Sequence, residues 1–187
     1  MGLREASFLA LLLLSGDVSA TEKCETTLLI GDSLAVGVAP RLAELAENSG
    51  GSLVTAAVVG TNTCQWRGKV WPLVVKHRPS KVIIILGTND AMVSGWAKKN
   101  ADCYGDIINE TLGTQVFWIL PPPMPFVIQR NIPDVRKAIA AAKVKIYDGI
   151  TDGDIPRSGD GVHMPMGVAG YDKWADRIAV WLKKNSS

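Results

Sequence analysis

The chain has 187 residues, of which 47% are hydrophobic and 20% charged, and its formal net charge is +2 at pH 7. This length suits one domain, and the composition excludes an intrinsically disordered protein, which would have fewer apolar residues and a higher net charge. The near balance of charges also argues against a protein that binds nucleic acid.

The first twenty residues have the pattern of a secretory signal peptide. Arg4 lies in a short N-terminal region, residues 7–14 are mostly apolar, and small residues form a cleavage site after them. Glu5 offsets Arg4, and a membrane anchor is the alternative, although the apolar stretch is too short to span a bilayer. We therefore expect residues 1–20 to be removed and residues 21–187 to form one domain. We expect this domain to be secreted or periplasmic, without a stable membrane anchor.

Beyond this leader, short apolar runs alternate with longer segments of helical periodicity. The predicted strands are, in chain order, 26–30, 53–59, 81–86, 115–120 and 143–147. The predicted helices are 40–47, 70–77, 100–112, 132–142 and 167–184. This alternation predicts a parallel β-sheet with helices on both faces, and such sheets bind ligands at the carboxyl ends of their strands.

Two of the predicted helices carry specific expectations. Pro40 suits the first turn of the first helix, because a proline lacks the N–H that would be unpaired there. The amphipathic pattern of the last helix predicts that four side chains face the core, namely Ala169, Trp174, Ile178 and Trp181.

Four polar segments follow predicted strands or precede the last helix. They are Gly31-Asp32-Ser33-Leu34, Gly60-Thr61-Asn62, Gly87-Thr88-Asn89-Asp90 and Asp160-Gly161-Val162-His163. In a parallel sheet, all four segments would meet at one edge.

These residue types suit acyl transfer. A serine hydroxyl is a weak nucleophile unless a base accepts its proton, and His163 is one of only two histidines. Asp160 lies three residues earlier, from where a carboxylate can orient the imidazole ring. The backbone N–H of Ser33, the backbone at Gly60 and the side-chain amide of Asn89 would form an oxyanion hole.

The four segments resemble the sequence blocks of the SGNH hydrolases, also called GDSL esterases and lipases. The Ser, Gly, Asn and His of that family match Ser33, Gly60, Asn89 and His163, in the same order along the whole mature chain. The resemblance implies a flavodoxin-like three-layer α/β/α fold with a five-stranded parallel sheet in the order 2-1-3-4-5. It also implies a catalytic triad of Ser33, His163 and Asp160.

Each of these residues also has a purely structural interpretation. Ser33 suits the N-cap of a helix, and Asn89 and Asp90 are common turn residues. His163 is alternatively a histidine of a surface loop. We expect Asp90 to support the loop and to take no part in catalysis.

The substrate is less well defined by the sequence. Trp66, Trp71 and Trp96 follow the second and third blocks, where aromatic rings would either contact a sugar or belong to the core. Residues 121–126 predict a rigid, proline-rich rim after the fourth strand. No segment is long enough for a large lid, which favours short acyl groups over long ones.

Three cysteines cannot all pair within one chain. Cys64 and Cys103 both belong to the carboxyl edge of the predicted sheet, whereas Cys24 precedes the first strand at the opposite edge. A disulfide needs Cα atoms within about 7 Å, so the topology predicts a bond between Cys64 and Cys103. Three unpaired cysteines are the alternative.

The sequence therefore predicts a secreted serine esterase of small-molecule or polysaccharide esters. We expect no cofactor and no metal, because no closely spaced set of Cys and His ligands occurs. The alternatives are an acyltransferase that uses the same triad and a noncatalytic carbohydrate-binding module of the same fold. A nucleotide-binding protein is disfavoured because the sequence lacks a phosphate-binding loop.

Overall fold

A parallel sheet of five strands forms the centre of the computed structural model, which describes residues 25–186. The strands are β1 (Thr26–Gly31), β2 (Ser52–Ala57), β3 (Lys81–Ile85), β4 (Gln115–Ile119) and β5 (Lys145–Tyr147). Their order is β2-β1-β3-β4-β5, and every neighbouring pair is parallel. The predicted fold class and strand order are confirmed. The predicted leader, residues 1–20, and Cys24 lie outside the described residues.

The central strands are buried on both faces. Val82 and Ile84 of β3 belong to one hydrophobic cluster, and Ile83 and Ile85 belong to the other. Because successive side chains of a strand point to opposite faces, an unbroken apolar run suits a sheet that is covered on both sides.

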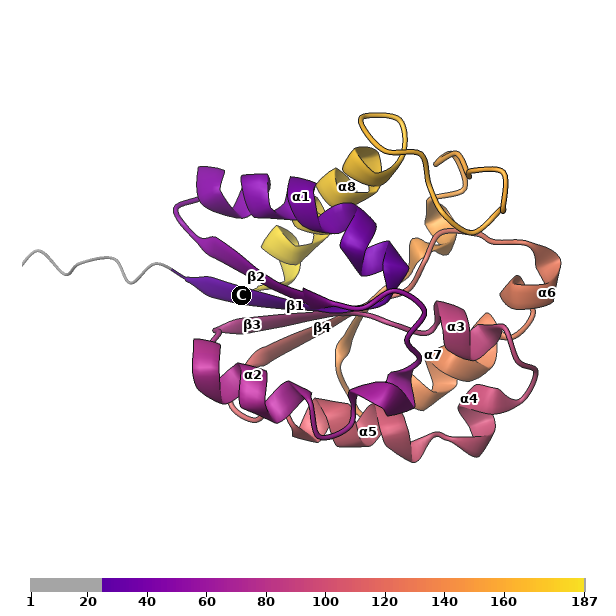
Figure 1. Cartoon of the computed structure of the whole chain (residues 1–187), viewed down its shortest axis with the longest axis horizontal. Helices are drawn as coiled ribbons and strands as arrows, with labels where there is room; N and C mark the ends of the chain where they lie inside the picture. The colour runs from indigo at the N-terminus through magenta and orange to yellow at the C-terminus, as the bar shows by residue number, and fades with distance from the viewer. Residues whose placement is uncertain (1–24, 187) are drawn as a thin grey trace, which may run out of the picture.

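The helices form two layers around this sheet (Figure 1). The helical elements are α1 (Ser33–Asn48), η1 (Thr63–Trp66), α2 (Val70–His77), α3 (Thr88–Ala91), α4 (Trp96–Lys99), α5 (Asp102–Asn109), α6 (Phe126–Gln129), α7 (Ile132–Ala140), η2 (Gly149–Thr151) and α8 (Tyr171–Asn185). α1 and α8 pack on one face, and α2, α5 and α7 pack on the other. The short helices α3, α4 and α6 lie near the carboxyl ends of the strands.

The first helix begins earlier than the sequence predicts. α1 starts at Ser33, so Pro40 lies inside the helix, and its prediction as a first-turn residue is wrong. The segment Val36-Gly37-Val38 combines two β-branched residues with a glycine, all of which have low helix propensity. Burial of Leu34, Ala35 and Val38 against the sheet compensates for this weak local preference.

The last helix also differs in detail. α8 begins at Tyr171, so Ala169 precedes it and is exposed, and the prediction that Ala169 faces the core is wrong. Trp174 and Ile178 are fully buried, and Trp181 packs against the same cluster, as predicted. Among residues 25–186, no helix is both long enough and apolar enough to cross a membrane.

Candidate active site

Ser33, His163 and Asp160 form a continuous hydrogen-bonded series. The Ser33 Oγ lies 2.8 Å from His163 Nε2, and His163 Nδ1 lies 2.5 Å from the Asp160 carboxylate. Ser33 is the first residue of α1, two residues after the end of β1, whereas His163 and Asp160 belong to the loop that precedes α8. The fold therefore joins residues that are 130 positions apart in the chain.

The Asp160 carboxylate is held by its own turn. One of its oxygens accepts hydrogen bonds from the backbone N–H groups of Val162 and His163, both at 2.9 Å, and the other faces the imidazole. The hydrogen bond from His163, together with these two N–H donors, lowers the pKa of Asp160 to about 2. Asp160 is therefore ionised at neutral pH, so His163 Nδ1 donates the proton and Nε2 is free to accept one from Ser33.

Arg157 holds the loop that contains Asp160 and His163, a role that no pattern in the sequence indicates. Its guanidinium donates to the carbonyls of Pro122 and Pro123 after β4 and to the carbonyl of Val162, which is adjacent to His163. The predicted proline-rich segment, residues 121–126, thus supplies hydrogen-bond acceptors for the loop of Asp160 and His163. These partners are backbone atoms, which exist at every residue, so no side-chain pattern identifies them.

Asp32, rather than Ser33, caps α1. Its carboxylate accepts a hydrogen bond from the backbone N–H of Leu34 at 2.9 Å, so the interpretation of Ser33 as the capping residue is wrong. Asp32 is fully buried, and this burial raises its pKa to about 7. Its second oxygen lies 3.3 Å from the Asn89 side-chain amide, which connects the first sequence block with the third.

Asn89 and Gly60 lie beside this series. The Asn89 amide donates to the carbonyl of Thr61 at 2.9 Å, so it binds the loop that contains Gly60. Gly60 has a φ of +78°, a conformation that L side chains rarely adopt, and no protein atom lies within 4 Å of the position a Cβ would occupy. A glycine is therefore required here by the positive φ of the backbone and not by a close neighbour, and the space beside it is open.

A buried network and a disulfide hold the next part of this loop. Asp90 accepts hydrogen bonds from the backbone N–H and the hydroxyl of Thr63 and from the Tyr104 hydroxyl. Cys64, which follows Thr63, and Cys103, which precedes Tyr104, form a disulfide with a Cα–Cα distance of 4.9 Å. The predicted cysteine pairing is confirmed, and the structural contacts of Asp90 agree with its expected supporting role.

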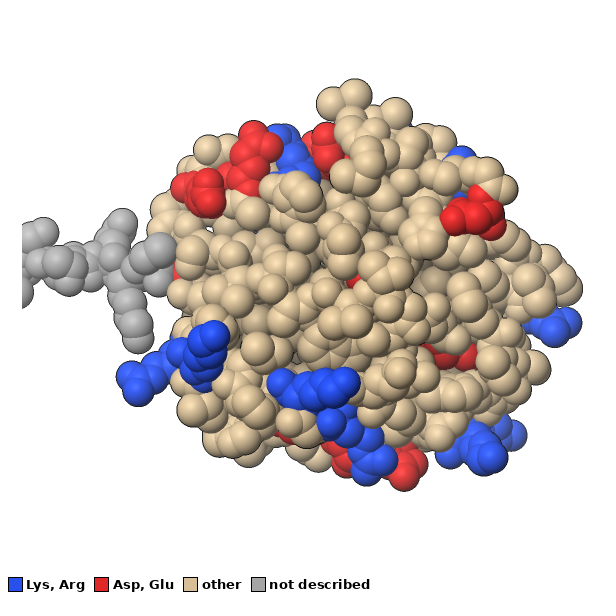
Figure 2. Space-filling view, in the orientation of Figure 1, with Lys and Arg blue, Asp and Glu red and all other residues tan. Residues whose placement is uncertain are grey.

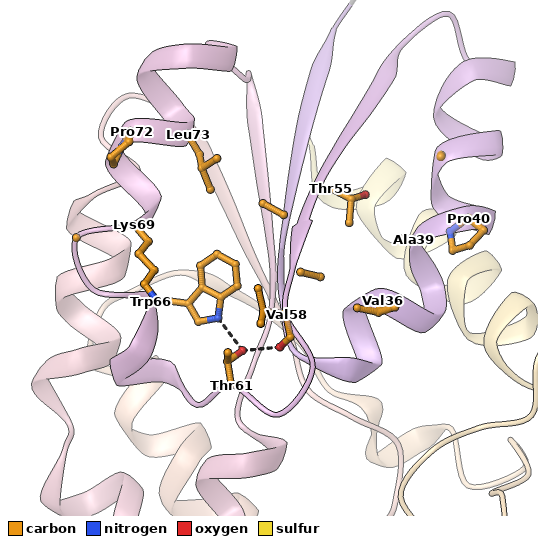
Figure 3. A pocket seen from close by; sticks show the side chains of 14 residues that line it. Val36, Ala39, Pro40, Thr55, Val58, Thr61, Trp66, Lys69, Pro72 and Leu73 are labelled. Carbon is orange, nitrogen blue, oxygen red and sulfur yellow. Dashed lines mark hydrogen bonds between the residues drawn. The ribbon is translucent and has the colours of Figure 1, made fainter.

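A groove of about 900 Å³ lies along the free edge of β2, between α1 and α2 (Figure 3). Val36, Ala39 and Pro40 of α1 form one wall, and Trp66 and Leu73 belong to the other. Of the three tryptophans singled out in the sequence, only Trp66 lines this groove; its indole N–H donates to Thr61. Trp71 is half exposed, and Trp96 packs against the core.

The arrangement defines a class of fold. A five-stranded parallel sheet in this order, with Ser33, His163 and Asp160 together at its carboxyl edge, agrees with the fold that the sequence resemblance to the SGNH hydrolases implies. The sequence matches no family model and no curated protein. The likeness therefore comes from solved structures.

This chain aligns with nearly the whole length of three of these structures. A lipase/acylhydrolase from Enterococcus faecalis aligns with a TM-score of 0.70 at 18% identity, over 86% of this chain and 96% of that one. The acetyl xylan esterase AlAXEase gives 0.68 at 17% identity, over 84% and 99%. The psychrotrophic esterase EstA from Pseudoalteromonas sp. gives 0.63 at 16%, over 85% and 99%. At these identities the likeness establishes the shared fold.

Proposed function

We propose that this protein is a serine esterase that hydrolyses carboxylic esters through an acyl-enzyme. The observation that carries the proposal is the hydrogen-bonded series from Ser33 through His163 to Asp160. It is the arrangement that activates a serine hydroxyl, because the imidazole accepts the hydroxyl proton while the carboxylate stabilises the resulting imidazolium. The fold shared with esterases and acylhydrolases supports it.

The reaction has two steps. The Ser33 Oγ attacks the ester carbonyl and transfers its proton to His163 Nε2, which then gives the proton to the departing alcohol. Water attacks the acyl-enzyme in the second step, with His163 again accepting and returning a proton. The backbone N–H groups of Ser33 and Gly60 and the Asn89 amide donate to the oxyanion. The Asn89 contact with Asp32 is long, at 3.3 Å, so this N–H is the one we assign to the oxyanion.

We propose short acyl groups and a secreted or periplasmic location. The connections between strands contain only short helices near the carboxyl edge, which supports an enzyme without a large lid. Polysaccharide esters and small soluble esters are both compatible substrates, and acetyl xylan esterases occur among the structures of this fold. The leader-like residues 1–20 support export, which N-terminal sequencing of the protein recovered outside the cytoplasm would test.

Two alternatives use the same fold. A noncatalytic carbohydrate-binding module would have no need for the Ser33–His163 contact, which this chain retains. An acyltransferase would use the same triad but transfer the acyl group to an alcohol. Adding an alcohol during turnover and measuring the ratio of transferred to hydrolysed acyl groups separates the two activities.

Hydrolysis of p-nitrophenyl acetate, butyrate and palmitate tests the proposal. We expect activity on the two short esters and a loss of about 10⁴-fold or more in kcat for Ser33→Ala. Ser49→Ala, at an exposed serine that follows α1, is the matched control and should retain full activity. Undiminished activity in Ser33→Ala would remove Ser33 as the nucleophile, and activity on palmitate alone would reverse the preference for short acyl groups.

A further inference from the structure

Exposed apolar side chains gather around the proposed active site. Among residues 25–186, fourteen large hydrophobic residues are exposed, and ten of them lie just beyond the carboxyl ends of strands or in the loop after His163. The other four lie on α2, on α8 and just before β4. Exposed apolar side chains concentrated in one region usually mark an interaction surface.

We call the five most exposed of these ten residues the apolar rim: Val59, Val93, Phe126, Met166 and Val168. Between 57% and 86% of each residue is accessible to solvent. They lie in the connections after β2, β3 and β4 and in the loop after His163, and Phe126 is the first residue of α6. Val59 is adjacent to Gly60, and Met166 follows His163 by three residues, which places the rim next to the reacting groups.

The site inside this rim is shallow. The side chains of His163 and Asp160 are 41% and 50% exposed, and the groove of Figure 3 lies beside β2 instead of over Ser33. An acyl chain that is bound inside the protein would need one enclosed channel. Exposed side chains on four separate connections instead suit a broad, deformable surface that covers the site as a whole.

Unpaired cations accompany the rim. Within the described part of the chain, four exposed cationic residues near the carboxyl edge have no ion-pair partner: Lys69, Lys98, Lys99 and Arg130. The carboxylates of the last two loops contact cationic or histidine side chains; these are Asp148, Asp152, Asp154 and Asp160. Asp102 and Asp134 lie in the first turns of α5 and α7, where the helix dipole offsets part of their charge. In Figure 2, basic side chains lie near α4 and near α6, and an acidic patch lies between them.

We propose that the apolar rim docks on a lipid–water interface that carries anionic headgroups, from which the ester is presented to Ser33. Apolar side chains that enter the interface and cations that contact the headgroups are the two components of peripheral membrane binding. The inference rests on the proposed function, since docking leads to hydrolysis of an ester only if Ser33 is the nucleophile. It does not depend on acyl length, because the alcohol part anchors the ester in the surface. Docking also covers the exposed His163–Asp160 pair and reduces its contact with bulk water, while single water molecules can still reach the acyl-enzyme.

Binding is measured separately from hydrolysis, with Ser33→Ala as the background. We expect this protein to sediment with vesicles of equal parts phosphatidylcholine and phosphatidylglycerol. Adding Phe126→Ser and Val168→Ser should lower the bound fraction at least fivefold. Leu112→Ser with Val180→Ser is the matched control, since these residues have similar exposure but lie outside the rim, and it should change binding less than twofold. Equal loss in both double variants, or no binding of the background protein, would overturn the proposal.

Two further comparisons test the occupant. Replacing Lys98, Lys99 and Arg130 by glutamine should reduce binding to the anionic vesicles several-fold at low salt, and equal binding to pure phosphatidylcholine vesicles would refute the headgroup preference. Self-association that the rim substitutions abolish, without vesicle binding, would assign the rim to a second copy of the chain. Because Ser33→Ala is inactive by design, absent vesicle binding and absent esterase activity are distinguishable failures.

Discussion

Asp32 contacts two parts of the site at once, because one oxygen caps α1 and the other faces Asn89. A buried carboxylate without a cationic partner favours its protonated form, and burial raises the pKa of Asp32 to about 7 from its ordinary value of 3.8. The protonation state of this residue therefore changes within the range in which the enzyme would work. The free energy of unfolding depends on the protonation of the same carboxylate.

The sign of this linkage gives a prediction. Between pH 4 and pH 7 the folded protein retains a proton on Asp32 that the unfolded chain has released, so its contribution to stability is lost as the pH rises. The free energy of unfolding should fall by up to about 1.4 kcal/mol per pH unit for this group. Asp32→Asn should remove that component. Urea unfolding at four pH values in this window measures it, and an identical slope in the variant and the wild type would exclude Asp32 as the group responsible.

The candidate catalytic residues were predictable because Ser33 belongs to a short motif just after β1, and Asp160 and His163 belong to a second short motif before α8. The motif around Ser33 and the spacing of Asp160 and His163 indicated their partnership, and the structure places all three in contact. Asp32 belongs to the same motif, yet its contact with Asn89 was not predictable. That contact depends on the relative position of two loops that are 57 residues apart.

Within residues 25–186, Arg157 donates the only side-chain hydrogen bonds that join the loop of Asp160 and His163 to the segment after β4. Arg157 is partly buried and donates to carbonyls of both the loop and the proline-rich segment. A planar guanidinium with five N–H donors can serve several carbonyls together, which a lysine ammonium cannot match in geometry.

We therefore expect Arg157→Lys to lower kcat on p-nitrophenyl acetate by about tenfold or more and to destabilise the fold by about 2 kcal/mol, as expected for lost hydrogen bonds from a charged group. KM should change less than threefold, because the residue positions His163 and does not contact the substrate. Arg41→Lys, at an ion pair between α1 and α8, is the control and should affect neither quantity strongly. A proportional rise of KM with unchanged kcat would contradict the positioning role.

At the level of elements, the strands were predicted more accurately than the helices. The uninterrupted apolar run of β3 requires burial on both faces, and this local pattern identifies the strand. The start of α1 was missed because Val36-Gly37-Val38 favours a helix only once it packs against the sheet and α8. A glycine is needed there, since a Cβ on Gly37 would overlap the Tyr171 ring. Such a requirement arises from tertiary packing.

For the molecule as a whole, the disulfide closes a segment between residues 39 positions apart. It connects η1 to α5, so it joins the loop after β2 to the layer of helices below the sheet. Topology alone predicted the pair, because parallel strands bring their carboxyl ends to one edge.

The double substitution Cys64→Ser with Cys103→Ser should lower the free energy of unfolding by up to about 4 kcal/mol, since it releases a loop of this length in the unfolded chain. Guanidinium unfolding of the oxidised wild type and the variant measures the difference. The wild type treated with a reductant should resemble the variant. A stability difference that persists between the reduced wild type and the variant would show that the serines themselves perturb the packing.

The order of the chain has a consequence for when activity appears. Ser33 lies near the beginning of the described fold, and its base lies 130 residues later, in the loop that α8 follows. A growing or refolding chain that has completed all five strands still has a serine without its histidine. Under the proposed mechanism, Ser33 gains its base only when the final segment folds back onto the sheet, so the protein would have no esterase activity until its structure is complete.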